Sequence, residues 1–527
     1  MSKSRDPRCR RRSRPPEIHK ARGIIHPRVQ QVGPEHFGVV CVDPAKNRSY
    51  WMLADFYGKV LVPTTIMEHT RPGFDASLRV LKEAMSKHQI RDLTVSVERT
   101  GNYHVRPKKM FEKAGFETRT IHGRTTNHFR QPADDGNKTD DTDLFAQHRA
   151  TVNGFGLIEQ PLEPLYAQLQ LLVRHRRDLV RKCVVLRCQI QEHLHLVMPG
   201  YARCFDSLFE SNIDLLIARH TGSGSALSQA GVKGLTQILQ QAKTPFQQRS
   251  LPKLIAWAAH AAESLDHADI HQRIWTDLDD DRRVKGLEIA RLEREIAGLL
   301  VATPYVLLMS IPGINVVSAA EFAAEAGPMA NYATPRSITG RAGLYPSRYQ
   351  SDQVDHANGP LVRSANRTLR NAIMLIADNL VGCNAYFKAL AKTWSQAGRD
   401  PRAVRVRVAC RFSRIAYHMV SGQMVFNHPS CQQRDSILDK LIVFHRGHDT
   451  PCDQVLRDLK AAALQLSPKT QTTEEPQLAS ELADLVVKLK ANARRVRTRG
   501  PRLLGDILLD VLIQRGFHAI ESQSSGE

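Results

Sequence analysis

Two short apolar runs near the start of this 527-residue chain each end in a carboxylate, Asp43 in the first and Glu98 in the second. In an open α/β sheet, side chains just past the carboxyl ends of neighbouring strands converge on one crevice. Asp140 and Asp143 are three residues apart at the start of a predicted helix, so they share a helix face and can point into the same crevice. Clustered carboxylates repel one another unless a divalent cation holds them, and hard oxygen ligands suit Mg²⁺ or Mn²⁺. The pattern therefore predicts metal-assisted phosphodiester chemistry.

The segment that carries the first two acids has the alternation of strands and helices expected of an RNase H-like or RuvC-like domain. Helices are predicted after Gly73 and around residues 103–115, giving the order β-β-β-α-β-α-β. The predicted strands are 37–42, 49–55, 59–65, 93–98 and 117–121. Antiparallel strands followed by βα units, with acids on the first and fourth strands, match this plan by analogy of fold.

A long helical stalk is predicted next. From Leu165 to Leu194 the apolar positions alternate spacings of four and three, which is a coiled-coil seam of about four heptads, and the helix should stop at Pro199. A second, shorter seam runs from Ile289 to Leu299. The two seams could pair as an antiparallel hairpin within one chain or dimerise, and periodicity does not choose between these arrangements.

A mainly helical domain is predicted after the stalk, which makes the expected fold class α/β plus all-α. Residues 308–315 (LMSIPGIN) have the signature of a helix-hairpin-helix, whose backbone N–H groups can bind a DNA phosphate at Gly313. An ordinary helix–helix turn is the alternative for this Pro-Gly pair. The expected parts are a disordered basic arm (1–36), the RuvC-like domain (37–160), the helical region with an insert (161–300), the C-terminal domain (301–426) and a helical extension (427–527).

The charge of the chain predicts a polyanionic partner. The formal net charge is +21 and the isoelectric point is near 9.8, although a merely soluble basic enzyme remains the alternative. Within the C-terminal extension, a linker is predicted near 466–478, followed by a basic tail. This tail is expected either to bind nucleic acid or to form a solvent-exposed surface. Nine scattered cysteines without a CxxC pair, no membrane span and no secretory signal suggest a cytoplasmic protein associated with the nucleoid.

Two segments of the C-terminal half carry a family resemblance. Residues 343–352 read GLYPSRYQSD and residues 359–370 read GPLVRSANRTLR. Together with the Pro-Gly hairpin, they resemble the C-terminal domain of the DEDD insertion-sequence transposases, the family numbered one hundred and ten. The segments 98–101 (ERTG) and 138–140 (KTD) look like the RuvC-like domain of the same family, and the likeness runs from about residue 37 to 426.

The resemblance implies a site-specific DNA recombinase that moves its own element. By that likeness, the metal-binding tetrad is Asp43, Glu98, Asp140 and Asp143, and the nucleophile is Ser351. Members of the family pair a structured RNA from the flank of their element with donor and target DNA. They assemble as a tetramer in which the acidic domain of one protomer completes the serine site of another. The expected partners are therefore DNA, a guide RNA and further copies of the chain, as a dimer or tetramer.

Cations near the serine segment are expected to bind the nucleic-acid backbone. Arg363, Arg367 and Arg370 follow helical spacings of four and three and would present one cationic face. Asn366 is expected to make a phosphate contact or a helix-cap hydrogen bond. Ser347 is the rival nucleophile and Ser364 a more distant one.

The chain departs from the family pattern at Asp352, where members usually have glycine after the nucleophile, and at Arg363 and Ala365, where lysine and glycine are usual. Two alternatives to the serine recombinase therefore stay open. One is a metal-only nuclease or junction resolvase, in which Ser351 merely binds phosphate. The other is an inactive nucleic-acid-binding remnant.

Overall fold

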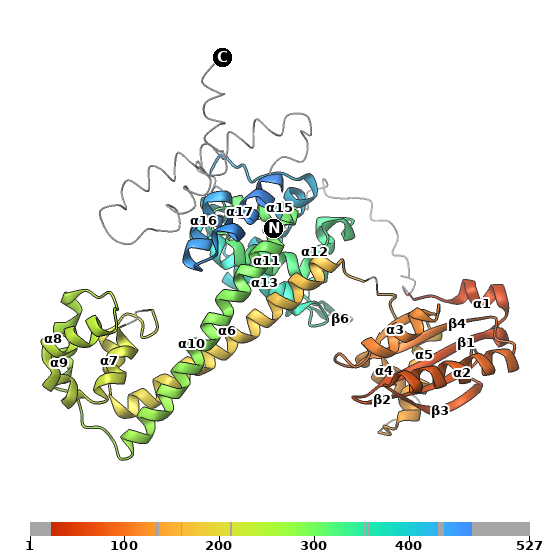
Figure 1. Ribbon diagram of the computed structural model, residues 1–527. Helices are drawn as coiled ribbons and strands as arrows, with labels where there is room; N and C mark the ends of the chain where they lie inside the picture. Colours follow the sequence, from red (N-terminus) through yellow and green to blue (C-terminus); the bar gives the residue numbers. More distant parts are fainter. Residues whose placement is uncertain are drawn as a thin grey trace. The chain divides into compact units, whose positions relative to one another are not determined.

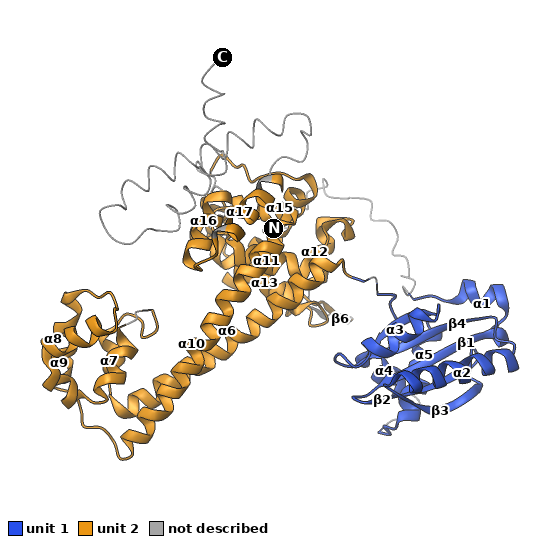
Figure 2. Cartoon of the chain, viewed as in Figure 1, with its two compact units in different colours: residues 1–161 blue, residues 162–527 orange. Residues whose placement is uncertain are grey.

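The computed structural model describes residues 23–131, 136–159, 161–210, 213–351, 354–356, 359–430 and 437–465. The chain divides into two compact units, Met1–Pro161 and Leu162–Glu527 (Figure 2). Most of the expected basic arm, the expected linker 466–478 and the basic tail lie outside the described residues. Within those ranges, no helix combines the length and the apolar character that crossing a membrane requires.

The first unit is built on a five-stranded sheet with the strand order β3-β2-β1-β4-β5 (Figure 1). Its strands are β1 (Phe37–Pro44), β2 (Arg48–Asp55), β3 (Val60–Glu68), β4 (Asp92–Arg99) and β5 (Glu117–His122). The first three strands are antiparallel, whereas β1, β4 and β5 run parallel. All five predicted strands are therefore present, and the mixed sheet is consistent with an RNase H-like domain.

Helices cover both faces of this sheet because its central strand is apolar on both sides. Val40 and Val42 pack on one face with Leu81 of α2 (Arg71–Lys87), and α3 (Val105–Lys113) adds to the same cluster. Val39 and Cys41 pack on the other face with Leu144. That leucine belongs to α5 (Asp140–Val152), which follows α4 (Gly123–Arg130), and α1 (His26–Val32) lies at the same cluster. Successive strand residues point to opposite faces, so alternate positions of β1 serve the two cores.

Two helices of 34 residues each, α6 (Pro164–Val197) and α10 (Ala268–Val301), pair with each other in the second unit (Figure 1). His193 contacts His271 near one end, and Arg176 contacts Glu293 toward the other, so the pair is antiparallel. The sequence left open whether the two seams pair within one chain or between copies, and here they pair within the chain. That the two helices supercoil around each other stays a prediction. Helix α10 begins at Ala268, well before the predicted seam, which starts at Ile289.

A small helical insert with its own core connects α6 and α10. It contains α7 (Asp214–Thr221), α8 (Gly224–Gln241) and α9 (Leu251–Ala258), with the short 3₁₀ helices η3 (Tyr201–Cys204) and η4 (Gln248–Ser250). Tyr201 and Trp275 are fully buried in its cluster, which also takes in Ile190 and Leu194 of α6. The insert therefore packs on the end of the helix pair where the chain leaves and returns.

The remaining helices form the largest core of the protein around the other end of the pair. The elements are η5 (Pro304–Ser310), α11 (Val316–Ala326), η6 (Met329–Asn331), α12 (Pro335–Arg341), β6 (Tyr349–Ser351), β7 (Val354–His356), α13 (Arg367–Cys383), α14 (Ala385–Gln396), α15 (Pro401–Gly422), α16 (Ile437–Gly447) and α17 (Cys452–Gln465). The predicted Pro-Gly hairpin is a turn, but the element before it is the 3₁₀ helix η5. The hairpin β6–β7 was not predicted.

A buried ion pair joins α6 to α11. Glu325 is fully buried, and Arg174 donates two hydrogen bonds to its carboxylate at 2.9 and 3.0 Å. Asn366 adds a weaker contact at 3.4 Å. A buried carboxylate without its cation is costly because little water can solvate it.

We expect Arg174→Ala to lower the free energy of unfolding of the second unit by about 2 kcal/mol. This is less than the loss of about 3–5 kcal/mol that is usual for a buried pair, because Arg174 is half-exposed. Denaturant titration of the full chain measures this change. The control is Arg181→Ala, an exposed arginine on the same helix, which should change stability by less than about 0.5 kcal/mol. Equal effects of the two substitutions would contradict the importance of the buried pair.

Candidate catalytic and nucleic-acid sites

Asp43 and Glu98 lie at the same edge and on the same face of the first unit's sheet. The parallel register pairs Val42 with Val97, so the next residue of each strand is one of the two acids. Val42 and Val97 both point into the core under α2. Their acidic neighbours therefore point to the opposite face, which α5 covers.

The first turn of α5 brings two more carboxylates to this face. Thr139 caps the helix by accepting a hydrogen bond from the backbone N–H of Thr142, and Asp140 is the first helical residue. Asp143 is buried one turn later, with 8% of its surface exposed. A further turn along, the side-chain amide of Gln147 donates to the Val42 carbonyl at 3.1 Å. This bond fixes α5 against the strand at the residue before Asp43.

The pKa of Asp43 reflects both its burial and the neighbouring acids. Burial and, to a smaller extent, the negative charges of Glu98, Asp143 and Asp140 together raise this pKa from 3.8 to about 7. Lys138 opposes them with a smaller effect. Charge interactions of this kind require the groups to be close, because water screens distant charges. The strand register, the start of α5 and these charge interactions together indicate that the four sequence-predicted acids lie near one another, and we call them the acid cluster.

The chemistry of this donor set fits a hard divalent cation, since all four side chains offer carboxylate oxygens and their mutual repulsion would fall on binding one. The arrangement itself is not closed around an ion: in the described part of the chain, no three His, Cys, Asp or Glu side chains are placed to hold a metal. Asp143 is instead paired with Arg130 of α4. Glu98 lies against the start of the same helix, where a Cβ on Gly123 would come within 3.0 Å of its carboxylate.

Asp141 points away from the cluster. Its carboxylate accepts a hydrogen bond from the hydroxyl of Thr64 on β3, two strands from β1. Of the neighbouring pair Asp140 and Asp141, the geometry thus brings the first to the other acids.

Ser351 lies in the second unit, at the end of β6, and its side chain is exposed. It pairs with Val354 across the hairpin, and Asp352 between them lies outside the described residues. The rival Ser347 is at the base, where its hydroxyl donates to the Pro360 carbonyl at 2.9 Å. Ser347 therefore has an internal partner, while Ser351 is accessible.

The predicted cationic face of Arg363, Arg367 and Arg370 is not formed as expected, because α13 begins only at Arg367. Arg363 lies in the preceding loop, so the helical spacing does not apply to it. Arg370 donates to the carbonyls of Ala342 and Val362 and so holds the chain beneath the serine hairpin. Arg363 and Arg367 are exposed.

Asn366 serves as the cap of α13, the second of the two roles expected for it. Its side-chain oxygen accepts hydrogen bonds from the backbone N–H groups of Thr368 and Leu369, at 3.1 and 3.0 Å.

The Pro-Gly turn is integrated into the helical core. Gly313 has φ +95°, a conformation that favours glycine, and a Cβ there would lie 3.2 Å from Cys383. Its carbonyl accepts a hydrogen bond from Asn379. Beside the turn is a groove between α6, α11 and α13 whose lining includes Arg177, Arg181 and Asn371. The turn thus opens onto a surface rich in arginine and amide groups.

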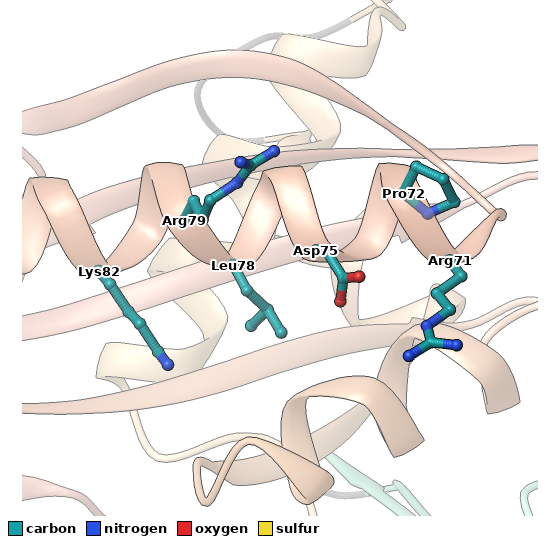
Figure 3. Close-up of a pocket in the computed structure, with 6 residues that line it drawn as sticks. All are labelled: Arg71, Pro72, Asp75, Leu78, Arg79 and Lys82. Carbon is teal, nitrogen blue, oxygen red and sulfur yellow. The ribbon is translucent and has the colours of Figure 1, made fainter.

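A shallow hollow on the outer face of α2 is unconnected with the acid cluster. It is lined along one helix by Arg71, Asp75, Arg79 and Lys82, with Leu78 between them (Figure 3). Because α2 and α5 cover opposite faces of the sheet, this hollow and the acids lie on opposite sides.

Sequence reasoning missed the residues that position the acids. Arg130 pairs with Asp143, and Gln147 hydrogen-bonds to the backbone of β1. Gly123 leaves room for the carboxylate of Glu98 because it has no side chain. Only Gln147 carried a local signal, since it lies four residues after Asp143 and so on the same helix face. Arg130 and Gly123 belong to α4, and no residue spacing in the sequence predicts that this helix lies beside the acids.

Comparisons with known proteins agree on one family. Residues 40–199 match the model of the DEDD transposases of IS110, described as a transposase, and residues 305–392 match that of the Transposase IS116/IS110/IS902 family. A protein of Streptomyces clavuligerus, the insertion element IS116 uncharacterized 44.8 kDa protein, is 25% identical over 331 residues. That alignment covers 58% of this chain and 75% of the relative. The first matched region includes all four acids and the second includes Ser351.

The raised pKa of Asp43 predicts a pH-dependent stability. An unfolded chain releases this proton near pH 4 and the folded protein near pH 7, so the free energy of unfolding should fall as pH rises between these values. In Asp43→Asn this slope should flatten, and at pH 8 the variant should be more stable than the wild type by about 1–3 kcal/mol, discounted for partial exposure. Thermal unfolding with a chelator measures both effects.

The matched control for this prediction is Asp141→Asn, which removes a carboxylate from the same turn but outside the cluster. It should leave the pH slope unchanged. A slope in Asp43→Asn as steep as in the wild type would show that the cluster does not carry the effect.

Proposed function

We propose that this chain, two regions of which match the models of the IS110/IS116-family DEDD transposases, cleaves and rejoins DNA. It would break DNA strands through a serine nucleophile assisted by its acid cluster. The observation that carries the proposal is geometric: the strand register places Asp43 beside Glu98, and α5, which begins with Asp140 and Asp143, packs on the face to which they point. Such a concentration of like charge destabilises a fold, and proteins keep it chiefly at functional sites.

Mg²⁺ or Mn²⁺ is the proposed cofactor, held by the four carboxylates. A divalent ion there would neutralise charge on the DNA phosphate and polarise the bond to its leaving oxygen. Arg130 contacts Oδ1 of Asp143, which leaves Oδ2 to serve as a ligand. The guanidinium of Arg130 meanwhile offsets part of the negative charge of the cluster.

Ser351 is the proposed nucleophile because its hydroxyl is exposed on a short hairpin that α13 anchors from below. Its Oγ attacks a backbone phosphorus, so that an Oγ–P bond forms while a P–O bond of the DNA strand breaks. The serine proton is lost to a base, and the leaving oxygen of the DNA gains one. The resulting phosphoserine link conserves the bond energy for rejoining.

DNA is the proposed substrate, with a guide RNA from the element and further copies of the chain as partners. The formal net charge of +21 supports a polyanionic partner, whereas the RNA and the assembly rest on the family resemblance alone. Arg363, Arg367 and the backbone at Gly313 are proposed phosphate contacts, since the two arginines are exposed and the turn adjoins an arginine-lined groove. Helix-hairpin-helix binding at that turn belongs to the same proposal.

We expect a covalent protein–DNA adduct on a denaturing gel when the full chain is incubated with Mg²⁺, element-end DNA and RNA transcribed from the flank. Ser351→Ala should abolish the adduct because it removes the attacking oxygen. Ser347→Ala is the matched control and should retain it, since its hydroxyl binds the Pro360 carbonyl. An adduct that survives Ser351→Ala would refute the assignment.

A metal-only nuclease is the second candidate, and one observation favours it: the four acids are assembled entirely within the first unit, without Ser351. Water would then be the nucleophile. Cleavage without an adduct, lost in Asp43→Asn but kept in Ser351→Ala, would support this alternative.

Metal binding by the cluster has a readout that does not depend on activity. Because a ligand that binds only the folded state stabilises it, Mg²⁺ or Mn²⁺ at about 100 times its dissociation constant should add about 2.7 kcal/mol to the wild type. Thermal unfolding with and without the ion measures this gain. Glu98→Gln should largely lose this gain in stability, whereas Asp141→Asn should keep it. A gain of equal size in the wild type and both variants would show that the ion binds elsewhere.

A further inference from the structure

The exposed face of α15 carries a line of cations that the proposed chemistry does not use. Arg407, Arg411 and Arg414 are all exposed, at spacings of four and three residues, so they lie along one side of the helix. The opposite side, including Val408 and Phe412, is fully buried in the core. We call these three residues the arginine stripe.

Aromatic rings of α14 hold two members of the stripe in place. The guanidinium carbon of Arg407 lies 6.0 Å from the ring centre of Trp394, and that of Arg411 lies 5.7 Å from Tyr386. The Nε of Arg411 also donates to the Tyr386 hydroxyl at 2.6 Å. A guanidinium fixed in this way loses less conformational entropy when it binds an anion.

The stripe is not neutralised by neighbouring acids. In the described ranges none of its three guanidinium groups has an ion pair, whereas the nearby Arg405 is paired with Asp378. A row of unpaired cations on a rigid helix repels itself and gains from an anionic partner.

The stripe also adjoins the root of the serine hairpin. Cys410 lies between Arg407 and Arg414, and its Sγ is 3.6 Å from the carbonyl oxygen of Leu344. The chain runs from Leu344 to Ser351 in seven residues. A backbone bound along the stripe would therefore pass the base of the segment that presents the proposed nucleophile.

We propose that the arginine stripe binds the sugar–phosphate backbone of duplex DNA next to the strand that meets Ser351. The inference rests on the proposed function. Along the helix axis the three residues are about 6 Å and about 4.5 Å apart, which gives a straight track of cations. Duplex is favoured over single-stranded nucleic acid because Tyr386 and Trp394 are half-buried beneath arginines, which leaves bases no free ring to stack on.

The test compares two triple variants of the full chain with equal loss of charge. The first is Arg407→Gln, Arg411→Gln and Arg414→Gln together. The control replaces three exposed cations of the helical insert, as Arg203→Gln, Lys233→Gln and Lys253→Gln. Fluorescence anisotropy measures binding of a labelled duplex of about 30 base pairs across a range of salt concentrations, with single-stranded DNA and RNA of equal length as parallel probes.

For the stripe variant, we expect the slope of log K against log salt on duplex DNA to become shallower by about 2–3, at about 0.9 per lost phosphate contact. Its Kd should rise at least tenfold at about 0.1 M salt, with the control triple within about twofold of wild type. Equal losses in both triples, or a greater loss on either single-stranded probe, would overturn the proposal. If the triple fails to fold, Arg414→Gln alone replaces it, with an expected slope change of about 0.9.

The experiment distinguishes a failure of DNA binding by the arginine stripe from a failure of the proposed serine chemistry. Ser351→Ala should bind the duplex like the wild type, because it leaves the stripe intact. A stripe variant that binds normally refutes the stripe whatever the adduct gel shows. Stripe-dependent binding by a wild-type protein that forms no adduct refutes only the serine chemistry.

Discussion

The parallel pairing of β1 with β4 is the constraint on which the first unit depends. Residue 42 faces residue 97 across this pair, which puts Asp43 beside Glu98 at one edge of the sheet. A slip of one residue would turn one of the acids toward the core under α2. The register is secured because both strands are buried on two faces, and their apolar residues fit only one alignment. The position of the acids is thus a by-product of how the hydrophobic core packs.

The repulsion among the buried acids lowers the stability of the folded protein. Burial and neighbouring charge keep the pKa of Asp43 near 7, which means that the folded state resists ionising it. Two contacts offset this cost: Gln147 fixes α5 to the backbone of β1, and Arg130 offsets the charge of Asp143.

The helical unit shows the same division between core and charged surface. Arg176 is a charged residue within the apolar seam of α6. It lies between Glu293 of α10 and Glu321 of α11 and so forms ion pairs that join three helices. Arg370 is a second case, since its side chain binds backbone carbonyls and no longer offers a free charge. Two arginines in basic segments thus turn out to be structural, while the arginine stripe on α15 is open to solvent.

The sequence by itself determined the five strands, the acids at the ends of the first and fourth strands, the start of α5 at Asp140 and the end of α6 before Met198. These features follow from local periodicity and capping, which neighbouring residues set. Only the tertiary structure decided that the two seams pair within the chain, that α13 starts at Arg367 rather than before Arg363, and that Arg130 and Gly123 reach the acids. Those outcomes depend on contacts between segments far apart in the chain. Residue spacing within one segment does not predict which side chains of another segment it will contact.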